Sequence, residues 1–187
     1  MFPHARHFFQ NPDWSFMEKL KSLNDLTVID ERHTLLAQLT GNIIDLEKLH
    51  TVVSSFELNE QVPDEIKSQY NVVRNMALYS YYCYSLAPEV QAKCFVLIEF
   101  GLRLREGSGR RLMLKNLLSL AIDKGWLCSR RFRYSPSFRE EDDLSARLVK
   151  TIPPLRNRFA HGVHVVSPNC TSHLALCADI LNQLFDG

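Results

Sequence analysis

The stretch APEVQAKCFVLIEFGLRLRE, residues 87–106, decides the fold class of this chain. Pro88 and Glu89 are typical of a helix start, and Gly107 and Gly109 are typical of the turn that ends one. Apolar residues between these signals recur every three or four positions, the period of one helix face; they are Val90, Cys94, Leu97, Ile98, Gly101 and Leu102. We therefore expect a long helix with one buried face.

The same period continues on both sides of this stretch. A preceding helix is expected to start at Val62-Pro63-Asp64-Glu65, with a stripe of Ile66, Tyr70, Val73, Ala77, Tyr81 and Tyr84. Three later helices are expected: one from Leu114 to a terminating Gly125, one from Leu144 to Gly162, and one from about Ser167 or Thr171 with Leu174, Cys177, Leu181 and Leu184. Pro153 and Pro154 must kink the middle one or restart it. No strand-like alternation lasts long enough to build a sheet, so the fold class is all-α.

The first 60 residues are expected to form a separate helical arm. A short helix is predicted near residues 13 to 24, with Phe16, Leu20 and Leu23 on one side. A longer helix is predicted from Asp30, its N-cap, to about Phe56. Gly41 lies inside it at a cost of about 1 kcal/mol relative to alanine. The domain organisation is therefore an arm, residues 1–60, on a helical bundle, residues 61–187.

Composition narrows the class of protein. The chain has 187 residues, 45% of them hydrophobic, and a formal net charge of +1. It can bury a sizeable core, and no global field draws it onto nucleic acid. We find no secretory signal and no run of the roughly 18 to 20 apolar residues that a membrane helix needs. The expected location is the cytoplasm, where the five cysteines are reduced thiols.

The segment LRNRFAHG, residues 155–162, carries the strongest functional signal. On a helix, Asn157 and His161 share one face because they are four residues apart, and Arg156 lies one step round. The negative end of the helix dipole favours a protonated His161. An imidazole that exchanges protons beside a permanent cation suits phosphate chemistry. The structural alternative is that Arg156 and His161 only complement the dipole in the last turn.

This segment resembles the signature of the HEPN superfamily (higher eukaryotes and prokaryotes nucleotide-binding domains). That signature is an Arg, often followed by a polar residue, then a short spacer and a His. It lies near the end of a late helix. The stretches VQAKCFVLIEFGLRLR and LMLKNLLSLAIDKGWL are similar to earlier helices of such domains, and the similarity covers roughly residues 64 to 186. The resemblance implies a HEPN-like bundle that pairs into a homodimer. It also implies RNA as the partner, with no cofactor and no metal.

Within that resemblance, three roles are implied for the motif. Arg156 holds the scissile phosphate, His161 moves protons, and Asn157 orients His161 or the phosphate. The implied activity is a metal-independent endoribonuclease of a toxin or defence system, giving 2′,3′-cyclic phosphate and 5′-OH ends. The alternative is a non-catalytic HEPN-like module that binds nucleotide or RNA, or forms a dimer that recruits an antitoxin or nucleotidyltransferase. A third possibility is a plain helical interaction protein.

A local basic cluster is the second candidate for RNA contact. Arg130, Arg131 and Arg133, with Arg139 further on, alternate with aromatic residues that can stack on bases; Arg158 of the motif helix is a further candidate. Alternatively, the four acids at 140–143 pair with this loop and it is simply solvated.

Three other patterns have mainly structural interpretations. The glycine-rich run at 106–109 lacks the features of a phosphate-binding loop and predicts a turn. Cys170, His173 and Cys177 have a spacing that a helix would align for zinc, but no paired C-x2-C accompanies them. The tyrosines at 79, 81, 82 and 84 wrap around a helix and predict packing.

Overall fold

The computed structural model describes residues 18–41, 45–138, 144–160 and 170–186, and these residues are helical or irregular with no β-strand. This confirms the all-α expectation. The α-helices are α2 (Glu31–Thr40), α3 (Leu46–Ser55), α4 (Asp64–Tyr79), α5 (Leu86–Glu106), α6 (Leu114–Asp123), α7 (Leu144–Ala160) and α8 (Thr171–Phe185). Short 3-10 turns are η2 (Leu23–Asp25), η3 (Ser129–Arg131) and η4 (Pro136–Phe138). Within the described ranges, none of the helices has the length and hydropathy to cross a bilayer.

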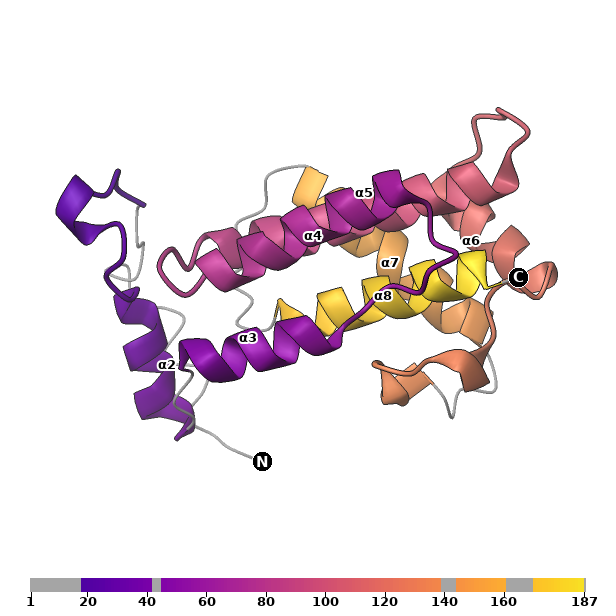
Figure 1. Ribbon diagram of the computed structural model, residues 1–187. Helices are drawn as coiled ribbons and strands as arrows, with labels where there is room; N and C mark the ends of the chain where they lie inside the picture. The colour runs from indigo at the N-terminus through magenta and orange to yellow at the C-terminus, as the bar shows by residue number, and fades with distance from the viewer. Residues whose placement is uncertain (1–17, 42–44, 139–143, 161–169, 187) are drawn as a thin grey trace.

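Helix α5 organises the bundle, because it packs against α4, α6, α7 and α8 (Figure 1). All the residues of its predicted stripe are buried. Gly101 lies at the closest approach to α8, where an added Cβ would come within 2.6 Å of the Leu181 Cδ2 atom. The absence of a side chain at Gly101 therefore sets how closely α5 and α8 can pack.

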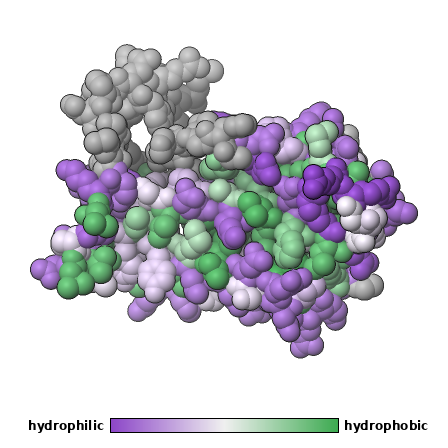
Figure 2. Space-filling model, turned by 90° about the horizontal axis from the view of Figure 1, so that it is seen from above, coloured by the Kyte–Doolittle hydropathy of each residue, from purple (hydrophilic) through white to green (hydrophobic). Residues whose placement is uncertain are grey.

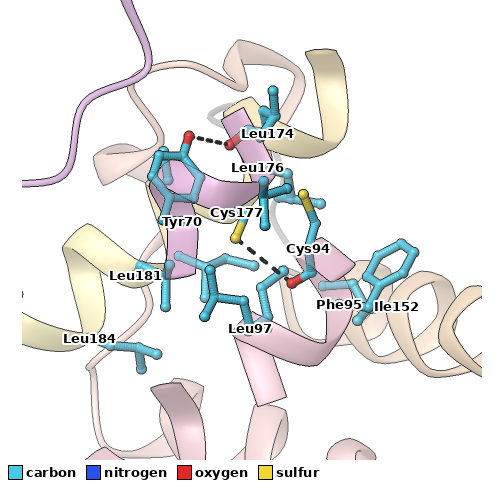
Figure 3. Packing of buried hydrophobic residues seen from close by; sticks show 14 of the residues in the cluster. Tyr70, Cys94, Phe95, Leu97, Ile152, Leu174, Leu176, Cys177, Leu181 and Leu184 are labelled. Carbon is cyan, nitrogen blue, oxygen red and sulfur yellow. Dashed lines mark hydrogen bonds between the residues drawn. The ribbon is translucent and has the colours of Figure 1, made fainter. Parts of the chain in front are cut away.

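Helix α8 is enclosed by the other elements. Every residue from Leu174 to Leu181 is buried, and the Tyr70 hydroxyl on α4 donates a 3.1 Å hydrogen bond to the Leu174 carbonyl. The Cys177 thiol lies 3.7 Å from the Cys94 carbonyl oxygen on α5 (Figure 3). Burial raises the pKa of the Cys94 thiol well above its usual range. Both thiols are thus part of the core.

The single long helix expected from Asp30 to Phe56 is wrong. Gly41 ends α2 with a φ of 73°, a left-handed conformation that glycine adopts without a steric penalty, and its N–H bonds to the Ala37 carbonyl at 2.9 Å. A new helix, α3, then starts with Asp45, whose side chain accepts a 2.7 Å hydrogen bond from the Lys48 N–H. Gly41 therefore acts as a C-terminal helix stop, where the sequence analysis treated it as a tolerated interior residue.

The short helix predicted near residues 13 to 24 is also not found in its described part. Residues 13–17, with Phe16, lie outside the described residues. Leu20 and Leu23 are 101% and 84% exposed, and only the three residues of η2 are helical. An apolar spacing of three or four residues is not enough for a helix when no surface is available to bury its stripe.

The segment around Asp30 is held to the α4–α5 turn by polar contacts. Asp30 caps α2 as expected, and its carboxylate also accepts a 2.9 Å hydrogen bond from the Tyr84 N–H. Arg32 bridges Asp30 and Glu18 at 2.6 and 2.7 Å. Burial opposes ionisation of Asp30, but the hydrogen bonds from Arg32 and Tyr84 outweigh it and lower its pKa to about 2. Helix α4 ends at Tyr79. The prediction that its apolar stripe continues to Tyr81 and Tyr84 is therefore wrong, because both tyrosines lie beyond the end of the helix.

The arm predicted for residues 1–60 contributes to the core through α3. Val53 is buried, and the Asn59 N–H donates a 2.7 Å hydrogen bond to the Asn182 side chain on α8. Helix α3 packs on α4 and α8. The division of the chain near residue 60 stays a prediction.

Candidate functional site around Arg156

The motif helix α7 runs without interruption through its two prolines. Pro153 and Pro154 lack an N–H, so the carbonyls of Val149 and Lys150 have no helical donor. The predicted apolar face nevertheless continues: Leu148 and Ile152 are buried, and Leu155 and Phe159 pack against the core in partly buried positions. That packing turns the intervening Arg156, Asn157 and Arg158 away from the core.

Among the described residues, Arg156 is the predicted catalytic residue for which the structure shows an interaction partner. Its NH2 atom lies 3.2 Å from the Glu99 Oε2 atom on α5, and its side chain is 38% exposed. Glu99 is only 15% exposed, and its Oε1 atom lies 2.6 Å from the Arg103 NH2 atom. The carboxylate of Glu99 therefore lies between two guanidinium groups. Glu99 was not among the predicted site residues, because nothing in the sequence distinguishes it from an ordinary charge on the exposed side of an amphipathic helix.

Of the other motif residues, the structure describes Asn157 and Arg158 but not His161. Asn157 and Arg158 are exposed on the last turns of α7. His161 lies outside the described residues, which end at Ala160 on this helix. The predicted approach of His161 to Asn157 therefore stays a prediction.

The basic loop is held against α8 by a buried carboxylate. Asp179 on α8 is 2% exposed and accepts hydrogen bonds from three consecutive backbone N–H groups, those of Arg133, Tyr134 and Ser135, at 2.8, 3.0 and 2.7 Å. Charge-assisted hydrogen bonds of this kind are among the stronger ones in proteins. The loop thus has a fixed backbone, which the sequence did not indicate.

The predicted RNA-contacting arginines of this loop have different environments. The Arg131 guanidinium donates to the carbonyls of Gly125 and Trp126 at 2.9 and 2.8 Å, which closes the end of α6. Arg130 is exposed, and Arg133 is exposed with its guanidinium 5.2 Å from the Tyr134 ring centroid. Arg139 lies outside the described residues. The guanidinium of Arg131 is thus bound to the end of α6, whereas the side chains of Arg130 and Arg133 are exposed to solvent.

In the part of the chain that the structure describes, the loop and the motif lie apart along α7 and not at one point. Arg147 near the start of α7 donates a 2.7 Å hydrogen bond to the Ser137 carbonyl, so this end of α7 adjoins the loop. Arg156 follows nine residues later, which corresponds to about 13 Å along a helix. A ligand that touched both regions would have to extend along α7.

The remaining patterns have structural roles. Gly107 and Gly109 have φ values of 68° and 72° and form the predicted turn between α5 and α6. Among the described residues, no group of three histidine, cysteine or acidic side chains is arranged to hold a metal ion. Cys170 and Cys177 are buried, and the His173 ring packs edge-on to Phe95 at 5.5 Å. Of the tyrosines, Tyr79 is exposed and Tyr84 is buried.

Comparisons with known proteins found no match: no family model, no curated protein and no solved structure is similar to this chain. The chemistry of the site follows from its residues. They provide an oriented, half-exposed guanidinium beside an exposed carboxamide, a set of donors that fits the oxygens of a phosphate group.

Proposed function

We propose that this chain is a HEPN-type, metal-independent endoribonuclease that acts in the cytoplasm as a homodimer, in a toxin or defence setting. The observation that carries the proposal is the position of Arg156. It lies half-exposed on the last turns of a late helix, with Asn157 beside it and His161 directly after the helix in sequence. The motif resemblance and the all-helical fold support the same assignment.

The proposed reaction uses the nucleophile that RNA itself carries. A base takes the proton of the 2′-OH, the 2′-oxygen attacks phosphorus, and the bond from phosphorus to the 5′-oxygen breaks as an acid protonates that oxygen. His161 takes one proton-transfer role, and its copy in the second subunit takes the other. Arg156 stabilises the negative charge of the transition state, and Asn157 orients the imidazole or the phosphate. The products are a 2′,3′-cyclic phosphate and a 5′-OH.

The homodimer is proposed to use the surface of α4 and α5. These helices carry exposed apolar side chains, Val72 and Tyr79 on α4 and Val96 and Leu104 on α5. Figure 2 looks down on this side of the molecule, and hydrophobic side chains gather along its middle. Val96 precedes Glu99 by one helical turn, so a second copy seated there lies next to Arg156. We expect analytical ultracentrifugation to give a dimer for the native chain and a monomer for Val96→Glu.

The decisive experiment is cleavage of a mixed RNA pool in EDTA. Native protein should cut RNA, leave cyclic phosphate ends and spare DNA, because DNA lacks the 2′-OH. His161→Ala and Arg156→Ala should not cut. His50→Ala, which removes an exposed histidine on α3, is the matched control and should cut like the native chain. Loss of cleavage in EDTA, or equal cleavage of DNA, would rule the mechanism out.

A non-catalytic HEPN-like module is the second candidate, and one observation favours it. The Glu99 carboxylate offsets part of the positive charge of Arg156, and the net charge of the chain is only +1. Both features weaken non-specific attraction to RNA. Such a module binds nucleotide or RNA without cutting it, or pairs with an antitoxin or nucleotidyltransferase. RNA binding without cleavage by the native chain, unchanged in His161→Ala, supports this candidate.

A further inference from the structure

The carboxylate of Glu99 links the proposed site to α5 through two separate contacts. One oxygen, Oε1, meets Arg103 at 2.6 Å, one turn later on the same helix. The other, Oε2, meets Arg156 on α7 at 3.2 Å. With its side chain only 15% exposed, Glu99 has little room to adopt other conformations. Its position is set by α5, the helix with the most packing partners in the bundle.

We propose that Glu99 is a positioning residue for Arg156, an inference that rests on the proposed ribonuclease function. An arginine side chain has several rotatable bonds, and its entropy must be lost before its donors can meet a phosphate in one geometry. The contact of Glu99 with the NH2 atom fixes that end of the guanidinium against α5. The guanidinium has further N–H donors besides the one that meets Glu99, and because the side chain is 38% exposed these donors can meet phosphate oxygens.

The charge of Glu99 has a second effect, opposite in sign to the first. Arg103 and Arg156 each carry a positive charge, and the carboxylate between them cancels one, so the cluster of three has a net charge of +1. Without the carboxylate the same cluster has a charge of +2 and attracts a phosphodiester more strongly. Glu99 therefore weakens binding of RNA while it improves the geometry of the bound state. A purely structural residue would not separate these two quantities.

Two substitutions at Glu99 isolate the two effects. Glu99→Gln removes the charge and retains the size of the side chain. We expect it to bind RNA three- to tenfold more tightly and to cut bound RNA at least tenfold more slowly. Glu99→Asp retains the charge but is shorter by one methylene. It should slow cleavage to a similar extent with no gain in affinity.

The control removes the charge of another glutamate of α5 that is also paired with an arginine. Glu106 lies 3.0 Å from Arg110 at the far end of α5, and Glu106→Gln should match the native chain in both measurements. Binding is measured in EDTA with 2′-O-methyl RNA, which has no free nucleophile, over a range of salt concentrations. Cleavage is measured in single turnovers, with the protein in excess over RNA and at a concentration that saturates the RNA. The tighter binding of Glu99→Gln should also be more salt-dependent than that of the native chain.

The outcomes separate the inference from the function on which it rests. If the native chain cuts and His161→Ala does not, but Glu99→Gln equals the native chain in binding and rate, only the positioning role is overturned. The same holds if Glu99→Gln weakens binding and cleavage together. If the native chain does not cut RNA in EDTA, the proposed function fails, and the role of Glu99 in orienting a catalytic Arg156 fails with it.

Discussion

Replacing Asp179 by asparagine should destabilise the fold by about 3 kcal/mol, because three backbone N–H groups depend on its two oxygens. The native carboxylate accepts from Arg133, Tyr134 and Ser135, and it is buried. Asparagine keeps one acceptor oxygen and replaces the other with an NH2 donor. One of the outer N–H groups then faces a donor in a buried position.

The magnitude follows from the strength of hydrogen bonds to charged groups. Losing one such bond costs about 1.5–3 kcal/mol, and the bonds that remain lose about 1 kcal/mol because their acceptor is now neutral. The sum of about 3 kcal/mol is a large part of the 5–15 kcal/mol that typically stabilises a domain. For a chain of this size it corresponds to a fall in Tm of about 6–12 °C.

Urea unfolding followed by circular dichroism measures this loss, and Asp186→Asn provides the control. Asp186 follows the same helix, but its side chain is 61% exposed and lies 3.9 Å from Arg131, so its replacement should cost less than about 0.5 kcal/mol. Amide hydrogen exchange supplies a local test, since the N–H groups of residues 133–135 should lose protection in Asp179→Asn. A loss below 0.5 kcal/mol, or an equal loss in Asp186→Asn, would refute the assignment of Asp179 as the anchor of the loop.

Three further predictions concern the core and the arm. Gly101→Ala gains about 1 kcal/mol in helix propensity but forces a Cβ to within 2.6 Å of Leu181. Urea unfolding should therefore show a net loss of about 1–2 kcal/mol in the free energy of unfolding. In a chain that already carries Leu181→Ala, where the clash is absent, Gly101→Ala should no longer cause this loss. The pKa of Asp30 is lowered to about 2 in the folded chain, below its usual value of about 3.9, so the folded state binds fewer protons. Its stabilising effect relative to Asp30→Asn should be complete above pH ~4 and should disappear as the pH falls through about 2, as measured by thermal unfolding across that range. Buried Cys94 and Cys177 should react with iodoacetamide only after unfolding, which mass spectrometry of labelled peptides can check; labelling of the native chain at either thiol would contradict their burial.

The helices from α4 onward could be predicted because their signals are local and agree with one another. Pro63 and the acids after it start α4 as expected, and the stripe of α5 is buried along its whole length. Gly41 was misinterpreted because a glycine within an apolar pattern fits both a helix interior and a helix end. Periodicity alone does not decide between them, since the choice depends on whether a second cap, here Asp45, follows.

The site was only partly predictable. The outward position of Arg156 follows from the apolar residues on either side of it, which the sequence shows directly. Glu99 and Asp179 could not be found in the same way, because their roles depend on contacts with residues far away in the chain. A single acid on a helix looks the same in sequence whether it faces water, a guanidinium or three backbone N–H groups.

The enclosed position of α8 has a consequence for synthesis of the chain. Translation delivers α3 to α7 before α8, yet Leu174 to Leu181 fill the space between them. Until those residues leave the ribosome, the apolar stripe of α5 has no partner on that side and is a surface for chaperones. During this interval the bundle that supports Arg156 on α7 is likewise incomplete. The bundle that holds Arg156 is therefore complete only after α8 has been synthesised and has packed into the core.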